Sequence, residues 1–216
     1  MTMETKIIFP KYSHYQTIII LHGMNQDIKD IIYIVDKIKS RKIGVKFIIP
    51  IANEMNIVWP DGKVEKCLSW YNYFTKYDNL IKHDSINVEE FEENTDKIVN
   101  IINEESKVIP PEMISLIGIS QGGTICINAA LKLKFKIKNI KCIDTIFLDT
   151  YYKYKKSPRQ NFQVLQSKKD KIYNPSFQNS CYSLLRSYNN NVEIHIRDNS
   201  HCENTDSIIR YILRTL

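Results

Sequence analysis

The serine at position 120 stands in the segment "GISQGG", with glycines at positions 118, 122 and 123 around it. The chain has six glycines, so half of them surround this serine, at the end of the apolar run "MISLI". In a nucleophile elbow a strand turns sharply into a helix, and glycines flank the serine because side chains there would collide with neighbouring backbone. The spacing therefore predicts that Ser120 is a nucleophile; the alternative is a glycine-rich turn with a surface serine.

A nucleophilic serine needs a base within hydrogen-bond reach and an acid that orients the base. The five histidines of the chain are His14, His22, His83, His195 and His201. The last of them, in "RDNSHCEN", follows the final apolar run and precedes the final helical pattern. A loop in that place exposes and positions an imidazole, so we predict His201 as the base.

Two aspartates are candidates for the acid. Asp170 lies in "LQSKKDKIYNP", after the apolar run "NFQVLQS"; the next run, "VEIHIRD", leads to His201. Asp149 ends the earlier run "TIFLD". Either choice gives the chain order nucleophile, acid, histidine that is typical of α/β-hydrolases. Asp170 also has a simpler interpretation as one charge in a lysine-rich loop, so the residues alone leave the acid open.

Short apolar runs alternate with helical patterns along the chain. We expect buried, mostly parallel strands at "TIIILHG", "GVKFIIP", "MISLIGIS", "DTIFLDT", "NFQVLQS" and "VEIHIRD". Apolar residues at helical spacing predict helices over Asp27 to Ser40 and Val88 to Glu105, and further helices after Ser120, Ser176 and Glu203. The second helix begins with Asn87 and Glu90 at capping-box spacing. The alternation predicts an α/β fold with a mostly parallel sheet and helices on both faces.

Two segments do not follow this pattern. "LKLKFKIKNIK" has the period of two that is typical of an exposed strand, but it stands where a helix should end, so it stays unassigned. The stretch from Ala52 to Lys82 is long for a connection, and "VWPDGKV" within it is a turn signature between two possible short strands. We expect this stretch, called the excursion below, to fold over the edge of the sheet.

Composition limits the remaining possibilities. A chain of 216 residues, 43% of them hydrophobic, is long enough for one core, so we expect a single domain over residues 1–216, as a monomer or a homodimer. No apolar run is long enough for a transmembrane segment and no signal peptide is recognisable, which predicts a cytoplasmic protein. The five cysteines form no C-x-x-C pair, so we expect reduced thiols and no metal site. The lysines at 132–141 have the spacing of a solvated face without a nucleic-acid motif, so no nucleic-acid partner is expected.

From "IIILHG" onward the sequence resembles the phospholipase/carboxylesterase family of α/β-hydrolases, which includes acyl-protein thioesterases. The resemblance is carried by "LHGMNQD", "SWYNYF", "PPEMISLIGISQGG", "LQSKKDKIYNP" and "SHCEN". It implies Ser120 as nucleophile, Asp170 as acid and His201 as base, with an oxyanion hole formed by the backbone N–H groups of Gln121 and Met24. It implies no cofactor and no metal.

The resemblance also implies the reaction, which is hydrolysis of a carboxylic ester or thioester through an acyl-enzyme. The substrate would be a small molecule or lipid, or an acylated protein. Two departures leave specificity open: Asn72 replaces the usual Asp after the Trp-aromatic pair, and Lys168 and Lys169 replace the usual His and Gly before the acid. The alternative function is a non-catalytic binding protein on a hydrolase scaffold.

The excursion is rich in large apolar side chains, namely Ile57, Val58, Trp59, Trp70, Tyr71, Tyr73 and Phe74. Such residues either pack the excursion onto the sheet or form one wall of an apolar acyl pocket beside Ser120. We predict substrate contacts for Trp59, Trp70 and Tyr71 and keep core packing as the alternative for each.

Overall fold

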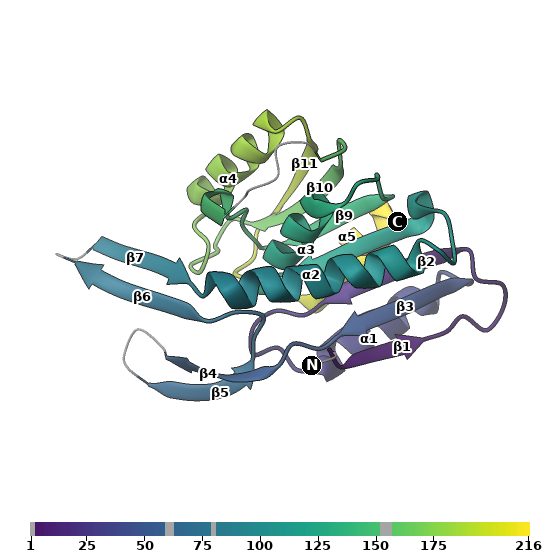
Figure 1. The fold of residues 1–216 in the computed structure, drawn as a ribbon, viewed down its shortest axis with the longest axis horizontal. Helices are drawn as coiled ribbons and strands as arrows, with labels where there is room; N and C mark the ends of the chain where they lie inside the picture. The colour runs from purple at the N-terminus through teal and green to yellow at the C-terminus, as the bar shows by residue number, and fades with distance from the viewer. Residues whose placement is uncertain (1–2, 59–62, 79–80, 152–156) are drawn as a thin grey trace.

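A computed structural model describes residues 3–58, 63–78, 81–151 and 157–216 of the chain. Its centre is a seven-stranded sheet in the order β1-β3-β2-β8-β9-β10-β11 (Figure 1). All neighbouring strands are parallel except β1 and β3, so the predicted mostly parallel sheet is confirmed. The strands are β1 (Thr5–Ile8), β2 (Gln16–Leu21), β3 (Val45–Pro50), β8 (Ile114–Ile119), β9 (Asn139–Ile143), β10 (Asn161–Ser167) and β11 (Asn191–Arg197).

In the described part of the chain, five α-helices cover both faces of this sheet, as predicted. Side chains alternate along a strand, so Ile19 and Leu21 of β2 join one core while Ile18 and Ile20 join the other. The first core also contains residues of α2, α3 and α4, and the second contains residues of α1 and α5. The helices are α1 (Ile28–Lys39), α2 (Val88–Glu105), α3 (Gln121–Lys132), α4 (Pro175–Ser187) and α5 (Thr205–Thr215), with 3-10 turns η1 (Pro111–Met113) and η2 (Asp149–Tyr151). Among the described residues, no helix is long and apolar enough to cross a membrane.

Side chains cap the two helices whose bounds the sequence predicts best. The carboxylate of Asp27 accepts from the backbone N–H of Lys29 at the start of α1, and Asn87 accepts from that of Glu90 at the start of α2. The capping box at α2 is only half formed, because the carboxylate of Glu90 accepts instead from the backbone N–H of Asn72, at 2.8 Å. This contact ties the start of α2 to the excursion.

The excursion and the four residues after it fold into two antiparallel hairpins that extend away from the main sheet (Figure 1). The first pairs β4 (Glu54–Val58) with β5 (Val64–Leu68), which confirms the short strands predicted around "VWPDGKV". The second pairs β6 (Tyr73–Asp78) with β7 (Ile81–Ile86) and was not expected from the sequence. A hairpin pairs locally, so each one forms without a neighbour in the main sheet.

The predicted strand over "DTIFLDT" is wrong. Strand β9 is the preceding segment, and residues 144–148 have no regular structure before η2 begins. The lysine-rich segment before β9 is a connection in which Leu133 and Ile137 are buried while Lys134 and Lys136 are exposed. Its period of two therefore reflects alternate burial without a strand, and the strand begins where that pattern ends.

One lysine of this region is fully buried. The ammonium group of Lys141, in β9, donates to Oε1 of Gln163 at 2.6 Å and to the carbonyl oxygen of Thr215 at 2.8 Å. The pKa of Lys141 is lowered to about 7, chiefly by burial and to a smaller extent by the nearby Lys138, while Glu193 opposes the shift. Because α5 packs over the sheet at this lysine, part of the Lys141 population is neutral near pH 7.

The buried lysine predicts a pH-dependent stability. An amine whose pKa is about 7 in the folded chain and about 10.4 in the unfolded chain makes the free energy of unfolding rise with pH between these values, because the unfolded chain binds the extra proton. Lys141→Met lacks this rise. The free energy of unfolding of wild type minus that of the variant should therefore increase by up to about 1.4 kcal/mol for each pH unit in this range. Urea unfolding at several pH values measures it. The exposed Lys134→Met is the control, and parallel curves for wild type and Lys141→Met would contradict the prediction.

Candidate active site

Ser120 occupies a strained turn between β8 and α3. Its backbone has φ 49° and ψ −121°, a conformation that non-glycine residues rarely adopt. The turn is held by neighbouring backbone, since the N–H of Ser120 donates to the carbonyl oxygen of Ile143 at 2.8 Å and its own carbonyl oxygen accepts from the N–H of Gly123 at 2.9 Å. The turn thus has the strand–turn–helix form that the sequence predicts.

The glycines at this turn leave no space for side chains. A Cβ atom at Gly118 would lie 2.4 Å from the Cα atom of Gly123, and one at Gly122 would lie 2.4 Å from the carbonyl oxygen of His22. These distances are well inside van der Waals contact. The glycines therefore allow α3 to begin directly against β8 and the end of β2.

His201 lies in the turn between β11 and α5 and joins the other two predicted residues. Its Nε2 atom is 2.9 Å from Oγ of Ser120, and its Nδ1 atom is 2.8 Å from Oδ2 of Asp170. With Nδ1 protonated, the imidazole donates to the carboxylate and accepts the serine proton at Nε2. The structure thus brings together three residues from the carboxyl ends of three strands.

The structure favours Asp170 over Asp149 as the partner of this histidine. Asp170 is 5% exposed, and its Oδ1 atom accepts from the backbone N–H groups of Ile172 and Tyr173, both at 2.8 Å. These bonds orient the carboxylate so that Oδ2 faces the imidazole. Asp149 instead accepts from the hydroxyl of Tyr188 at 2.5 Å.

His22, another candidate for the base, has a structural role. It is fully buried: Nδ1 is 2.7 Å from the carbonyl oxygen of Gly23, and Nε2 accepts from the N–H of Ala52 at 3.1 Å. Burial lowers the pKa of His22, against a smaller opposing effect of the Gly23 hydrogen bond, so the ring is held neutral. Its two nitrogen atoms are both engaged away from Ser120.

The predicted oxyanion donors lie on two segments next to the serine. Gln121 is the first residue of α3, and the N–H groups of a helix's first turn have no partner within the helix. Met24 lies in the turn after β2, where a Cβ on the preceding Gly23 would be 3.3 Å from Cβ of Ser120. The turn therefore lies against the serine.

Hydrogen bonds hold the Met24 turn in place. The N–H of Gly23 donates to Oε1 of Gln26 at 2.8 Å, and the N–H of Asn25 donates to the carbonyl oxygen of Leu68 at 2.9 Å. The N–H of Met24 itself donates to no acceptor in the described part of the chain. This N–H can therefore donate to a negative charge that develops on a substrate oxygen beside Ser120.

The side chain of Gln121 has a role that the sequence did not reveal. It is buried, its Oε1 atom accepts from the backbone N–H of Trp70 at 2.8 Å, and its Nε2 atom donates to the carbonyl oxygen of Tyr71 at 2.8 Å. The hydroxyl of Ser69 also bonds this amide. One residue of the elbow therefore fixes the excursion to the site.

The two described aromatic residues with predicted substrate contacts are core residues. Trp70 and Tyr71 are both 0% exposed. The indole N–H of Trp70 donates to the carbonyl oxygen of His22 at 2.8 Å, and the ring of Tyr71 meets that of Phe91 edge to face. The packing alternative describes both, and neither offers a surface to a substrate in this conformation. The third, Trp59, lies outside the described residues.

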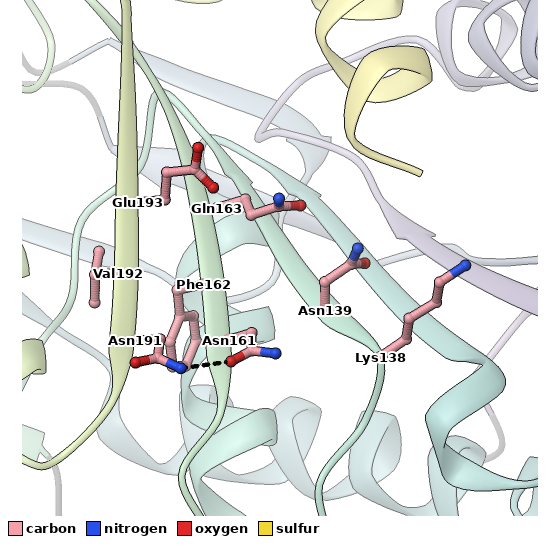
Figure 2. A pocket seen from close by; sticks show the side chains of 8 residues that line it. All are labelled: Lys138, Asn139, Asn161, Phe162, Gln163, Asn191, Val192 and Glu193. Atoms are coloured by element: carbon pink, nitrogen blue, oxygen red, sulfur yellow. Dashed lines mark hydrogen bonds between the residues drawn. The ribbon is translucent and has the colours of Figure 1, made fainter.

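Two surface cavities lie away from Ser120, Asp170 and His201. One, of about 410 Å³, is lined by polar side chains such as Asn161, Gln163 and Glu193 at the amino ends of β9, β10 and β11 (Figure 2). The other, of about 470 Å³, lies between α2 and the strands β1 and β3. Ligands of open α/β sheets bind at the carboxyl ends of the strands, where Ser120 lies, so neither cavity belongs to this site.

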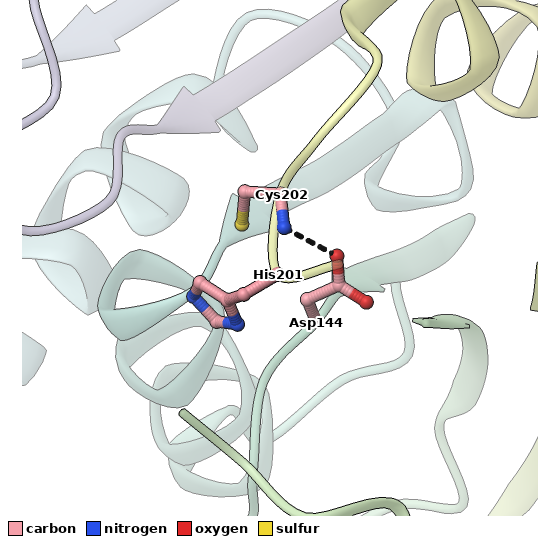
Figure 3. A group of neighbouring side chains, drawn as sticks. All are labelled: Asp144, His201 and Cys202. Atoms are coloured by element: carbon pink, nitrogen blue, oxygen red, sulfur yellow. Dashed lines mark hydrogen bonds between the residues drawn. The ribbon is translucent and has the colours of Figure 1, made fainter. Parts of the chain in front are cut away.

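A group of three possible metal ligands lies beside the histidine. Asp144, His201 and Cys202 place their ligand atoms within 4.8 Å of one another (Figure 3). The carboxylate of Asp144 already accepts from Arg197 and from the N–H of Cys202, and burial raises the pKa of the Cys202 thiol, so that it stays protonated. These donors compete with a cation, and we do not assign the group to a metal.

Comparison with known families places this geometry in context. The sequence profile of the family described as phospholipase/carboxylesterase matches residues 3–212. The chain belongs to this family. The resemblance noted in the sequence is thereby confirmed.

Individual relatives agree with this assignment. Acyl-protein thioesterase 1 of Cryptococcus neoformans is 28% identical over 140 residues, which span 64% of this chain and 57% of the relative. Acyl-protein thioesterase 2 of Zea mays superimposes with a TM-score of 0.73 at 14% identity, covering 98% of each chain. The carboxylesterase of Bacillus cereus does so with 0.72 at 14% identity, covering 99% of this chain and 95% of that one. At such identities the structural likeness shows the α/β-hydrolase fold.

The elbow geometry predicts that Gly122 tolerates a side chain less well than Gly23 does. We expect Gly122→Ala to lower the free energy of unfolding by about 1–3 kcal/mol, because its Cβ meets backbone that cannot rotate away. Gly23→Ala, whose nearest contact would be 3.3 Å, is the matched control and should lose less. Urea unfolding of both variants measures the difference, and equal losses would show that the contact with His22 is easily relieved.

Proposed function

We propose that this chain is a serine hydrolase that cleaves carboxylic esters or thioesters through an acyl-enzyme. Ser120 is the nucleophile, His201 the base and Asp170 the acid. The observation that carries the proposal is the continuous hydrogen-bonded chain from Asp170 Oδ2 to His201 and on to Ser120 Oγ, with distances of 2.8 and 2.9 Å. Membership of a family of phospholipases and carboxylesterases supports it.

The first half of the reaction forms the acyl-enzyme. Nε2 of His201 takes the hydroxyl proton while Oγ of Ser120 bonds to the carbonyl carbon of the substrate. The carbonyl oxygen becomes an oxyanion, which the backbone N–H groups of Gln121 and Met24 stabilise. The tetrahedral intermediate collapses when the imidazolium gives its proton to the leaving alcohol or thiol.

The second half releases the acyl group. A water molecule gives its proton to Nε2 of His201 and attacks the acyl carbon, and Ser120 leaves with that proton. Asp170 remains ionised throughout, holds the Nδ1–H tautomer and stabilises the imidazolium. All proton transfers therefore pass through one imidazole nitrogen.

The same tetrahedral chemistry serves esters and thioesters. The name of the Cryptococcus relative supports acyl thioesters of proteins as a substrate class, and the family description supports lipid and simple carboxylic esters. A panel of short and long acyl esters and acyl-peptide thioesters separates these classes by kcat/KM.

Removal of either reacting side chain tests the proposal. We expect Ser120→Ala and His201→Ala each to lower turnover of an activated ester by about 10⁴-fold or more, since the two residues act as a unit. A fluorophosphonate probe should label wild type at Ser120 and leave Ser120→Ala unlabelled. A folded wild-type protein that neither labels nor hydrolyses any ester of the panel would favour the alternative of a binding protein on a hydrolase scaffold.

The two aspartates provide a matched pair. We expect Asp170→Asn to lower kcat by roughly 10³ to 10⁴-fold, because an amide favours the wrong histidine tautomer. Asp149→Asn, whose amide oxygen can still accept from the hydroxyl of Tyr188, should stay within a few-fold of wild type. Steady-state kinetics of both variants after a check of folding measures this, and a reversal of the two effects would transfer the acid's role to Asp149.

A further inference from the structure

A second aspartate, Asp144, lies at the carboxyl end of β9 and is fully buried. Its Oδ1 atom accepts from the N–H of Ser167 at 2.8 Å. Its Oδ2 atom accepts from the guanidinium of Arg197 at 2.7 Å, from the hydroxyl of Ser167 at 2.9 Å and from the N–H of Cys202 at 2.8 Å. The carboxylate thus contacts the end of β10, three residues before Asp170, and the loop after β11, which carries His201.

Arg197, the cation of this pair, holds the other side of the histidine loop. It is 8% exposed, and its Nη1 atom donates to the carbonyl oxygen of Glu203 at 2.7 Å. Its Nε atom donates to the hydroxyl of Ser167 at 2.9 Å. Asp144 therefore bonds the loop that carries His201 at Cys202, and Arg197 bonds the same loop at Glu203. His201 immediately precedes these two contact residues.

The same strand end also holds the nucleophile. The carbonyl oxygen of Ile143 accepts from the N–H of Ser120 at 2.8 Å, and the hydroxyl of Thr145 donates to the carbonyl oxygen of Ser120 at 2.6 Å. Asp144 lies between these two residues. Consecutive residues of one segment therefore contact the backbone of Ser120 and the backbone beside His201.

The backbone around these contacts is strained. Asp144 has φ 43° and Cys202 has φ 51°, both in the left-handed region that non-glycine residues rarely adopt. Such conformations persist only where the surroundings over-determine them. The hydrogen bond from the N–H of Cys202 to Asp144, drawn beside His201 in Figure 3, joins the two strained residues directly.

We propose that the buried Asp144–Arg197 pair is a positioning device for the proposed catalytic base. It sets the distance between His201 and Ser120 by fixing the histidine loop to the strand end that also holds the serine. The inference rests on the proposed function, because it assigns a role in catalysis to groups that touch no substrate. Asp144 and Arg197 act through His201 and are positioning residues.

The test compares variants of this pair with a second buried pair elsewhere. Asp144→Asn keeps the shape of the side chain but has a single acceptor oxygen, so it cannot accept from the N–H of Ser167 at one position and from Arg197 and the N–H of Cys202 at the other, as the carboxylate does. Arg197→Lys keeps the charge but cannot reach Ser167, Asp144 and Glu203 together. Displacement of a catalytic group by about 1 Å costs on the order of 100-fold, so we expect kcat to fall by about 10 to 100-fold in both variants, with KM within about 2-fold.

The control is Glu105→Gln. Glu105 is a buried acid, 4% exposed, whose carboxylate accepts from Lys46 at 2.6 Å and from the hydroxyl of Thr17 at 2.6 Å, at the amino end of the sheet. It loses a buried ion pair as Asp144→Asn does, so it reports the cost of that loss to stability. Its kcat should stay within about 2-fold of wild type in conditions where all variants are folded.

A pH–rate profile supplies a readout that stability does not change. A misplaced His201 exchanges its contacts with Asp170 and Ser120 for others, so the acid limb of the profile should move in Asp144→Asn and Arg197→Lys and stay in place in Glu105→Gln. The proposal is overturned if both pair variants keep the kcat of the control, or if kcat falls while both profiles stay unmoved. If Asp144→Asn does not fold, Arg197→Lys decides alone. A wild-type protein without hydrolysis or fluorophosphonate labelling would instead overturn the proposed function.

Discussion

The close approach of α3 to the end of β2 is the constraint on which the rest of the site depends. At Gly122 a single added carbon atom would lie 2.4 Å from the carbonyl oxygen of His22. The same carbonyl oxygen accepts from the indole N–H of Trp70. The residue before Gly122 in the elbow, Gln121, accepts from the backbone N–H of Trp70. One peptide group thus joins the elbow, the turn that carries Met24 and the excursion. A site assembled from three such segments keeps its geometry because none of them can move without the other two.

Local signals explain what the sequence predicts correctly. Asp27 and Asn87 cap their helices through bonds to residues two or three positions away, so the starts of α1 and α2 are readable from short segments. The elbow is equally local, because its glycines are required by contacts within and directly around the turn. The choice of His201 over the other histidines follows from its place after a strand. The fold class, Ser120 and His201 were therefore within reach of local sequence reasoning, whereas only the family resemblance separated Asp170 from Asp149.

The features that the sequence did not reveal depend on contacts between distant residues. Lys141 made β9 look like part of an exposed, lysine-rich stretch, yet its amine is satisfied by Gln163 and Thr215, which no local pattern shows. The strand was predicted over "DTIFLDT" instead of over β9. Asp144 therefore stood inside a predicted apolar strand and was not recognised as a buried acid. Its partner Arg197 lies far along the chain, and a buried charge is recognisable only with that partner in view. The side chain of Gln121 was missed for the same reason.

The order of the three residues along the chain has a consequence for biosynthesis. Strand β8, which ends at the nucleophile, lies in the middle of the sheet and pairs with β2 across a long stretch of sequence, since Thr17 faces Ile114. A chain made from its N-terminus presents β1, β2 and β3 before the serine turn, and the loop with His201 only after β11. A nascent chain therefore contains the serine without its imidazole. Under the proposed mechanism such a chain is inert toward the acyl groups around it, and reactivity appears when the last loop docks on the end of β9.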